Sequence, residues 1–553
     1  MLSLGCVLGT ALPARAQVTP PDAGSLLRQI EQLPKPLPQA QPLAEPARTP
    51  AVHAADEPKV LVKGFNLVGA TQAPADLLGE RLARFINKRM SLAELDEAIQ
   101  TVLASYREQG YVARAYLPPQ TIKDGVVDIM VIEGRLGRVL VEPGRLSSER
   151  AEAYVRQDLA AGALIKTEQL ERNLLLLRDL PGTSVAATLE PGAAKGEIDV
   201  RLALSDAPLL SGALAVNNSG SRGTGANQLD AQLNLNGIAG VGEQWNLRAL
   251  DAAGLAYGRL ALNWPVAYAG LNVGANFATM RYRLGDQFAS LDARGSAQSG
   301  GLGAAYPLLR SRMGNLYASA SLEERRYVNE GAGKIVSDKK IDTLSLGLSG
   351  NRYDGDGATS YGLTLSGGRL DLSAQAENLA ADAASTQAQG RYLKLAWNVS
   401  RQQNLGETLA ISAALAGQLA DKNLDSSEKL YLGGPSGVRA YPVNEAGGDA
   451  GWLLNLELRA LLAPDWQAML FADAGSVERN RRLWNGWQGR STAPNRVDLA
   501  GAGLGVNWNV WNSVARLSLA WRLGNNPLAG ANGADSDGTR RTPRLWAQYN
   551  KFF

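Results

Sequence analysis

Apolar and polar side chains alternate strictly in several stretches between residue 207 and residue 553. The alternating apolar positions include Leu229, Leu233 and Leu235, then Leu344, Leu346 and Leu348, then Leu454, Leu456 and Leu458, and finally Leu517, Leu519 and Trp521. Successive side chains of a β-strand point to opposite faces, so each stretch predicts a strand with one apolar and one polar face.

The size of this region decides between a soluble sandwich and a membrane barrel. Polar faces look toward water in a sandwich, whereas apolar faces look toward lipid in a barrel. About 350 residues, at about 20–22 residues per strand and turn, make roughly 16 strands, which would be unusual for one sandwich. We therefore predict an all-β transmembrane barrel of about 16 antiparallel strands over residues 207–553. Phe553 ends the last strand with Leu545 and Tyr549 on the same face, an ending common in outer-membrane barrels, and we interpret Phe553 as a barrel assembly signal.

The first residues have the pattern of an export signal. An apolar core over residues 2–12 is too short to span a bilayer, and Ala14-Arg15-Ala16 matches an A-x-A cleavage pattern. We predict a signal peptide over residues 1–16.

Residues 17–57 combine a short amphipathic helix with a proline-rich linker. Leu26, Leu27, Ile30 and Leu33 share one helical face. A helix of about two to three turns is marginal alone and must dock to be stable. Prolines then recur from residue 34 to residue 50 and favour an extended linker. A tethered plug and a loosely ordered tail both fit this pattern.

Two small mixed modules are predicted between the linker and the barrel, over residues 58–134 and 135–206. Each has the order strand, two helices, two strands. The predicted elements of the first are strands over 60–68, 112–117 and 126–133, a helix over 76–87, and a helix capped by Ser91 and Glu94 with Leu92, Leu95, Ile99, Leu103 and Tyr106 on its buried face. Superposing Leu95 on Leu170 gives a period of 75 residues. Such modules expose strand edges, which can pair with an incoming extended chain.

The composition excludes several classes of function. The chain carries one cysteine and one histidine, and its net charge is only +3. Cys6 lies in the predicted signal peptide and His53 in the linker, so we expect no metal site, no cofactor and no catalytic residue, and no nucleic-acid partner. Charged stretches near 325–326 and 479–482 are interpreted as solvated rims of the barrel.

One segment carries a candidate mechanism. The stretch Gly433-Gly434-Pro435-Ser436-Gly437-Val438-Arg439-Ala440-Tyr441-Pro442 predicts a tight tip that bears a single charge, Arg439. Phe471, Asp473 and Gly475 share one face of a predicted strand. If that face looks inward, Asp473 can receive an arginine from a loop folded into the lumen as a bidentate pair. An extracellular turn with an unrelated lumen aspartate is the alternative.

These residues resemble a known family. The tandem modules resemble POTRA domains, and the architecture resembles the Omp85 superfamily. The stretch from Gly437 to Pro442 and the Phe-x-Asp-x-Gly strand resemble the two-partner secretion transporters of the TpsB family, although Ala440 stands where members often have Gly. The resemblance implies a sixteen-stranded barrel, a helix at the N-terminus that plugs the pore, and a loop over 433–450 folded inside. The implied contacts between loop and wall involve Gly437, Val438, Arg439, Tyr441, Phe471, Asp473 and Gly475.

The resemblance also implies a function, location and partners. Its POTRA domains would capture an unfolded TpsA-type exoprotein, adhesin-like or haemolysin-like, in the periplasm and pass it without ATP through the outer membrane of a Gram-negative bacterium. Barrel assembly machinery and outer-membrane lipids are further expected partners. An Omp85-type insertase of other barrels and a passive porin remain the alternatives.

Overall fold

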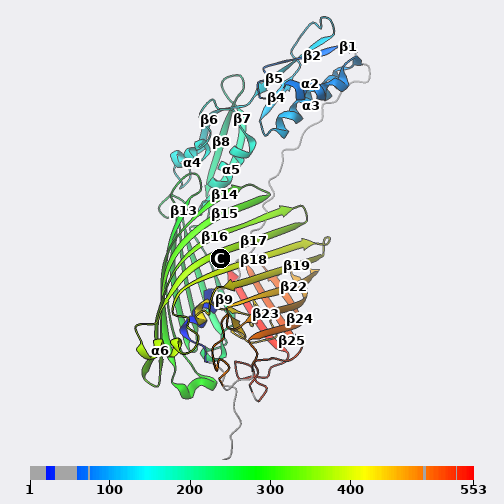
Figure 1. Cartoon of the computed structure of the whole chain (residues 1–553). Coiled ribbons are helices and arrows are strands. Elements are labelled where there is room, and N and C mark those ends of the chain that lie inside the picture. The colour runs from blue at the N-terminus through cyan, green and yellow to red at the C-terminus, as the bar shows by residue number, and fades with distance from the viewer. Residues whose placement is uncertain (1–19, 32–58, 73–74, 490–492, 531) are drawn as a thin grey trace, which may run out of the picture.

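The computed structural model describes residues 20–31, 59–72, 75–489, 493–530 and 532–553. Figure 1 shows two small α/β modules at one end of a large barrel, with the loops around α6 (Ala376–Ala383) at the opposite end. The predicted signal peptide over 1–16, residues 32–57 of the segment with the linker, and Leu33 lie outside the described residues.

The first module holds a three-stranded sheet in the order β2-β5-β4, with β2 parallel to β5. Its elements are β1 (Val60–Val62), β2 (Gly64–Val68), α2 (Ala75–Leu82), a 3-10 turn η1 (Ala83–Phe85), β3 (Lys88–Met90), α3 (Leu92–Glu108), β4 (Ala113–Tyr116) and β5 (Val126–Glu133). The single strand expected over 60–68 is divided, because β1 pairs with β3 while β2 pairs with β5.

Helix α3 begins as the sequence predicts. The Ser91 hydroxyl accepts from the backbone N–H of Glu94, and the Glu94 carboxylate accepts from the backbone N–H of Ser91. Leu95, Ile99 and Tyr106 are buried, but Leu92 is 55% exposed, so its place on the buried face was wrong. Leu92 is the first residue of the helix, next to the cap, and is not part of the core of this module.

The second module repeats this arrangement with the sheet order β6-β8-β7. Its elements are β6 (Arg135–Glu142), α4 (Ser148–Arg156), α5 (Thr167–Arg178), β7 (Thr183–Pro191) and β8 (Glu197–Asp206). The parallel pair β6–β8 corresponds to β2–β5 of the first module, and each module packs its helices around a core of its own.

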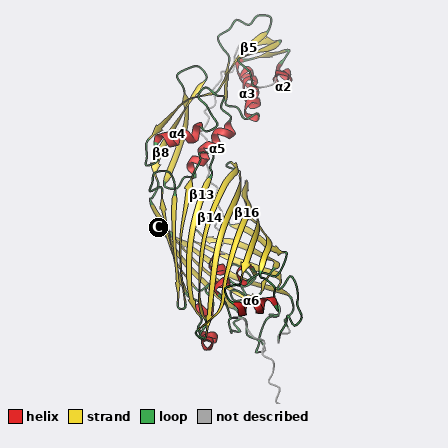
Figure 2. Ribbon diagram, turned by 60° about the vertical axis from the view of Figure 1, so that its left-hand side comes forward, coloured by secondary structure: helices red, strands yellow, loops and turns green. Residues whose placement is uncertain are grey.

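Within the described residues, sixteen antiparallel strands close into a barrel, as β26 pairs with β9. These are β9 (Leu210–Asn217), β10 (Gln228–Asn236), β11 (Gln244–Ala252), β12 (Leu255–Pro265), β13 (Asn272–Arg283), β14 (Arg294–Arg310), β15 (Gly314–Gly331), β16 (Lys334–Asp354), β17 (Gly357–Asp371), β18 (Gly390–Asn404), β19 (Leu409–Ala420), β22 (Ala450–Ala463), β23 (Trp466–Glu478), β24 (Arg496–Val510), β25 (Ser513–Arg522) and β26 (Arg544–Phe552). Figure 2 shows the tall strands β14 and β16 reaching toward the modules. The predicted fold class is confirmed.

The two faces of the barrel wall differ as the alternation predicts. Leu344, Leu346 and Leu348 of β16 are 45–52% exposed and form part of the outer surface. Phe553 follows β26, and its backbone N–H and carbonyl both pair with Gly212 at the seam that closes the barrel. Among the described helices, none is long and apolar enough to cross a membrane.

The barrel interior contains two clusters of buried apolar residues. One surrounds helix α1 (Ala23–Glu31), and the other surrounds the connection between β19 and β22. This connection, residues 421–449, is called the lumen loop below. It includes a short 3-10 turn η4 (Ser426–Glu428) and a two-residue pair of strands, β20 (Leu430–Tyr431) and β21 (Gly447–Gly448).

Candidate functional site

The tip of the lumen loop is buried against the inner wall of the barrel. Val438, Ala440 and Tyr441 are at most 1% exposed and pack with Phe471 of β23 and Val497 of β24. Burial of these apolar side chains stabilises the docked position of the loop. Residues 433–449 thus lie inside the barrel, and the loop begins twelve residues earlier than the sequence indicated, at residue 421, and ends one residue earlier, because Ala450 is the first residue of β22.

Two glycines allow close approaches, one within the loop and one between the loop and the wall. A Cβ atom on Gly437 would collide with the carbonyl of Leu432 in the loop itself. A Cβ atom on Gly475 would lie 2.7 Å from Cδ2 of Leu432 and 3.0 Å from the carbonyl oxygen of Trp452. Because real side chains do not tolerate such distances, Gly475 leaves the space in the wall that Leu432 fills.

Arg439 forms a bidentate pair with Asp473, whose side chain is completely buried. Nε donates to Oδ2 at 2.8 Å and an Nη donates to Oδ1 at 2.7 Å, and the backbone N–H of Arg439 also donates to Oδ2 at 3.1 Å. The guanidinium carbon lies 3.6 Å from the centre of the Phe471 ring. The planar fork of arginine fits this double contact with carboxylate and ring in a way that lysine cannot.

Further side chains complete the contact, and sequence reasoning missed them. The other Nη of Arg439 donates to Glu457 at 2.7 Å. The Asn455 amide donates to both the Gly437 carbonyl and Asp473. The indole of Trp546 donates to the Arg439 carbonyl at 2.7 Å. Asn455 and Glu457 alternate with leucines in the sequence, which predicts that both side chains face the lumen but does not predict which residues they contact.

Tyr441 points to a different neighbour from Arg439. The guanidinium of Arg522 lies 5.0 Å from the centre of the Tyr441 ring, and Arg522 also pairs with the buried Asp535. Beyond Tyr441, Glu445 accepts hydrogen bonds from Asn526 and Ser536. The lumen loop is therefore held by the wall at its tip and by the connection between β25 and β26 beyond it.

Helix α1 lies in the barrel lumen with its apolar face covered. Leu26, Leu27 and Ile30 are at most 4% exposed. They pack in a cluster with wall residues that include Leu250, Tyr257, Met280, Tyr282, Tyr327 and Ile341. The marginal helix thus has the docking surface that its short length requires.

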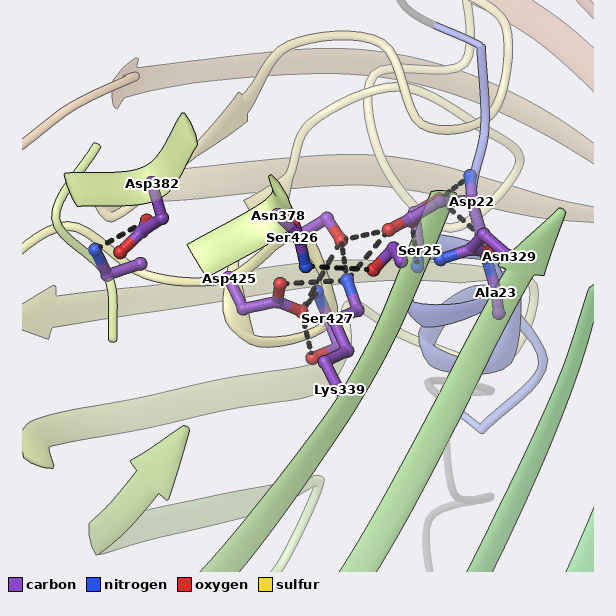
Figure 3. A network of polar contacts seen from close by, with 12 residues as sticks. Asp22, Ala23, Ser25, Asn329, Lys339, Asn378, Asp382, Asp425, Ser426 and Ser427 are labelled. Carbon is purple, nitrogen blue, oxygen red and sulfur yellow. Dashed lines mark hydrogen bonds and ion pairs between the residues drawn. The ribbon is translucent and has the colours of Figure 1, made fainter. Parts of the chain in front are cut away.

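A shared lysine connects the first turn of α1 to the wall and to the lumen loop (Figure 3). Nζ of Lys339 on β16 lies 2.9 Å from Asp22 and 2.8 Å from Asp425, and the Ser426 hydroxyl donates to Asp22 at 2.7 Å. Asp22 also accepts from the backbone N–H of Ser25, as an N-cap residue does. One buried cation therefore neutralises a carboxylate of the helix and a carboxylate of the loop.

The remainder of α1 also contacts the loop and the wall. Arg28 donates to the Ser427 carbonyl at 3.3 Å, and the amide of Asn444 donates to Gln29 at 3.2 Å. Arg248 of β11 donates to the Ile30 carbonyl at 3.0 Å, at the helix end where unpaired carbonyls favour a cation.

A second charged cluster holds the lumen loop beside α1. Glu428 accepts from Arg325 of β15 at 2.7 Å and pairs with Lys394 of β18. Burial opposes the charge of Glu428, but Lys394 and Arg325 outweigh it and lower the pKa of Glu428 to about 2. The interpretation of residues 325–326 as a solvated rim was wrong for Arg325, which lies in the lumen because neighbouring strand residues face opposite sides.

In the part of the chain that the structure describes, no group of three potential metal ligands comes together. Inside the barrel, a docked helix and a folded loop instead share salt bridges with the wall.

Comparison with known proteins places the chain in one family. Residues 196–508 match the family of haemolysin secretion/activation proteins ShlB/FhaC/HecB, and residues 60–134 match the POTRA domain of the ShlB type. Since the first match spans more than half of the chain, the chain belongs to this family of secretion proteins. The resemblance found in the sequence is confirmed.

Curated relatives are similar over nearly their whole length. The heme/hemopexin transporter protein HuxB of Haemophilus influenzae strain 86-028NP is 28% identical over 543 residues, 95% of each chain. The outer membrane transporter CdiB of Dickeya dadantii is 24% identical over 451 residues, 78% of each chain.

Solved structures share the fold. CdiB from Escherichia coli superposes with a TM-score of 0.69 at 18% identity over 96% of each chain. BamA from Haemophilus ducreyi, lacking POTRA domains 1–3, superposes with a TM-score of 0.53 at 14% identity, over 89% of this chain and all of that one.

Proposed function

We propose that this chain is an outer-membrane transporter that exports an unfolded partner protein of the TpsA type from the periplasm to the cell surface. Its family and the names of HuxB and CdiB, both called transporters, support this function. The observation that carries it is helix α1 docked inside a barrel that is joined to POTRA modules, because a passage that opens for cargo needs a removable closure.

The closed state is proposed to open when α1 leaves the lumen. The segment between Glu31 and Lys59 is 27 residues long and rich in proline. At about 3.1 Å per extended residue it reaches roughly 80 Å, which allows the helix to withdraw while staying attached. The lumen loop is proposed to remain anchored through Arg439 and Asp473 and to form part of the wall of the open passage.

The POTRA modules are proposed to receive the cargo in the periplasm. Within the described residues, β2 and β4 are the outer strands of the first sheet, and β7 is an outer strand of the second. An extended cargo segment can add to such an edge through main-chain hydrogen bonds. Folding of the cargo outside the cell, rather than ATP hydrolysis, is proposed to drive export, and the chain is proposed to act as a transporter and not as an enzyme.

Assembly into the outer membrane is proposed to use the chain's C-terminal strand. Phe553 closes the ladder against Gly212, and its ring is exposed on the outer surface together with Leu545 and Tyr549. This end of the chain is proposed to be what the barrel assembly machinery recognises.

Mass spectrometry of the medium and membranes from strains with and without this gene tests the proposed function. We expect one large protein to vanish from the medium while other outer-membrane proteins stay level. A joint fall of many outer-membrane proteins would identify an insertase instead. An unchanged medium, with the candidate partner shown to be expressed, would leave a passive porin and overturn the proposal.

A further inference from the structure

A row of charged side chains crosses the outer surface of the barrel. Glu324, Asp342, Arg369 and Arg391 lie on β15, β16, β17 and β18, and each is the direct cross-strand partner of the next. All four are exposed. They alternate along their strands with residues that face the lumen, so their side chains point away from the barrel axis.

An apolar row lies next to the charged row, one step closer to the modules. It consists of Leu302, Leu322, Leu344, Gly367 and Leu393, again in direct cross-strand register. The exposed fractions of Leu302 and Leu322 are 64% and 59%. Such a surface belongs in lipid rather than in water.

The charged row lies at one boundary of the apolar band. On the outer face of β16, Asp342 and Arg352 enclose Leu344, Leu346 and Leu348. Ten residues at about 3.4 Å each, tilted by about 40°, span roughly 26 Å, which matches the apolar height of about 25 Å of outer-membrane barrels. Because Arg352 is at the end nearer the modules, the charged row faces the headgroups of the outer leaflet.

A groove of about 820 Å³ lies between the two rows. Its floor includes Gly300 and Gly367, which face outward, and the backbone of Gly301 and Gly368, which face the lumen, and its sides include residues of both rows. A Cβ atom placed on Gly300 or Gly367 would meet nothing within 4 Å. The glycines therefore leave open an apolar depression that ordinary strand residues would fill.

The charges beside the groove are unevenly balanced. Lys340 pairs with Glu324 at 2.6 Å and with Asp342 at 3.5 Å. Arg369 and Arg391 lie directly opposite each other, and neither has a carboxylate oxygen within 4.0 Å among the described residues, although Asp371 on the same face of β17 attracts Arg369 from farther away. Like charges in this position repel each other, so an anion from outside the chain would relieve a local cost.

We propose that this groove binds a phosphorylated, multiply acylated lipid of the outer leaflet. The lipid's phosphates contact Arg369 and Arg391, and one acyl chain fills the glycine-floored depression beside the leucines. This assignment depends on the barrel lying in the membrane and not on the export of any cargo. It would fix the tilt and depth of the long strands β14 to β18, which carry some of the wall residues that hold α1, Tyr327 and Lys339 among them.

Native mass spectrometry of the full chain in detergent, titrated with bisphosphorylated hexa-acylated lipid A, tests the proposal. The first variant, Arg369→Gln with Arg391→Gln, removes the cations. At about 1 kcal/mol for each basic residue, we expect roughly 30-fold weaker binding. The second, Gly300→Leu with Gly367→Leu, fills the depression and should also weaken binding by tenfold or more.

A matched control, Arg352→Gln with Arg496→Gln, removes two exposed arginines that do not border the groove and should bind lipid A like the wild type. All variants should keep the heat-modifiable mobility of a folded barrel. Wild-type affinity in both test variants would overturn the proposal. Displacement of the lipid by an equal concentration of inorganic phosphate would overturn the assignment to a lipid.

Discussion

Replacing Arg439 by alanine is expected to release the lumen loop while leaving the barrel assembled. The substitution removes two hydrogen bonds to Asp473, one to Glu457 and the stacking on Phe471. The Asp473 carboxylate stays buried at the wall with Asn455 and a backbone N–H as its remaining donors.

The expected magnitude follows from this burial. Removing one partner of a buried ion pair costs about 3–5 kcal/mol, because the other charge is left uncompensated. The undocked population of the loop should then rise by roughly 10² to 10³ or more. Arg459→Ala is the matched control, since Arg459 contacts Glu457 but not Asp473 and its side chain is 24% exposed. We expect at most about 1 kcal/mol for this control.

Two readouts check the prediction. Secretion of the partner protein, measured by immunoblot of the medium, should fall at least about tenfold for Arg439→Ala at an unchanged level of folded barrel. Trypsin should cut the loop after Lys429, whose side chain is only 16% exposed in the docked loop, far faster in this variant than in Arg459→Ala. Wild-type export together with an exposed loop would refute the role given to the loop contact, and a protected loop would refute the energetic reasoning.

Other contacts give predictions of the same kind. Lys339→Met leaves two carboxylates without their shared cation, so the open time of the channel in planar bilayers should rise by about tenfold or more, whereas Lys340→Met on the outer face should have no effect. Burial opposes the charge of Asp22, but Lys339 holds the pKa of Asp22 well below the usual carboxyl range. The Asp22–Lys339 pair therefore stabilises docking of α1 fully above about pH 4, and this stabilisation is lost only at lower pH. The contribution of Asp22 should therefore stay constant from about pH 8 to about pH 5, and a change in open time over that range that Asp22→Asn abolishes would contradict the assignment. Gly475→Ala brings a Cβ atom to 2.7 Å from Leu432, which should weaken loop docking by about 1–3 kcal/mol and accelerate trypsin cleavage; unchanged cleavage would show that Leu432 can move aside.

The strands and their number can be predicted from the sequence because lipid and lumen impose opposite polarity on the two faces. Strict alternation on so many strands, as at Leu344 and Leu346, is typical of a barrel wall between lipid and a polar lumen. The alternation also puts Asp473 on the inner face, and Arg439 is the single charge on a glycine-rich tip. These two observations predict the pair that the structure contains. Local rules also suffice for the cap of α3 at Ser91.

Contacts between distant segments could not be predicted in this way. Asp22 and Lys339 are separated by 317 positions, and no local pattern links them. Arg325 and Arg326 look like one charged patch in sequence, yet Arg325 pairs with Glu428 inside the barrel and Arg326 with Asp338 outside. The lumen acts as a second interior in which buried charges are paired, and sequence alone does not show which polar residues meet there.

Locking α1 to the lumen loop tests the central claim most directly. A Cβ atom on Gly24 would lie 2.8 Å from Cβ of Ser427, so Gly24→Cys with Ser427→Cys needs a shift of only about 1 Å to reach disulfide geometry. Cys6, the chain's one native cysteine, is replaced by serine in every variant so that it cannot form a competing disulfide. We predict that the oxidised double variant assembles but does not export its partner, that a reductant restores export, and that each single variant exports normally. Undiminished export with the disulfide fully formed would contradict an exporter that opens by releasing this helix.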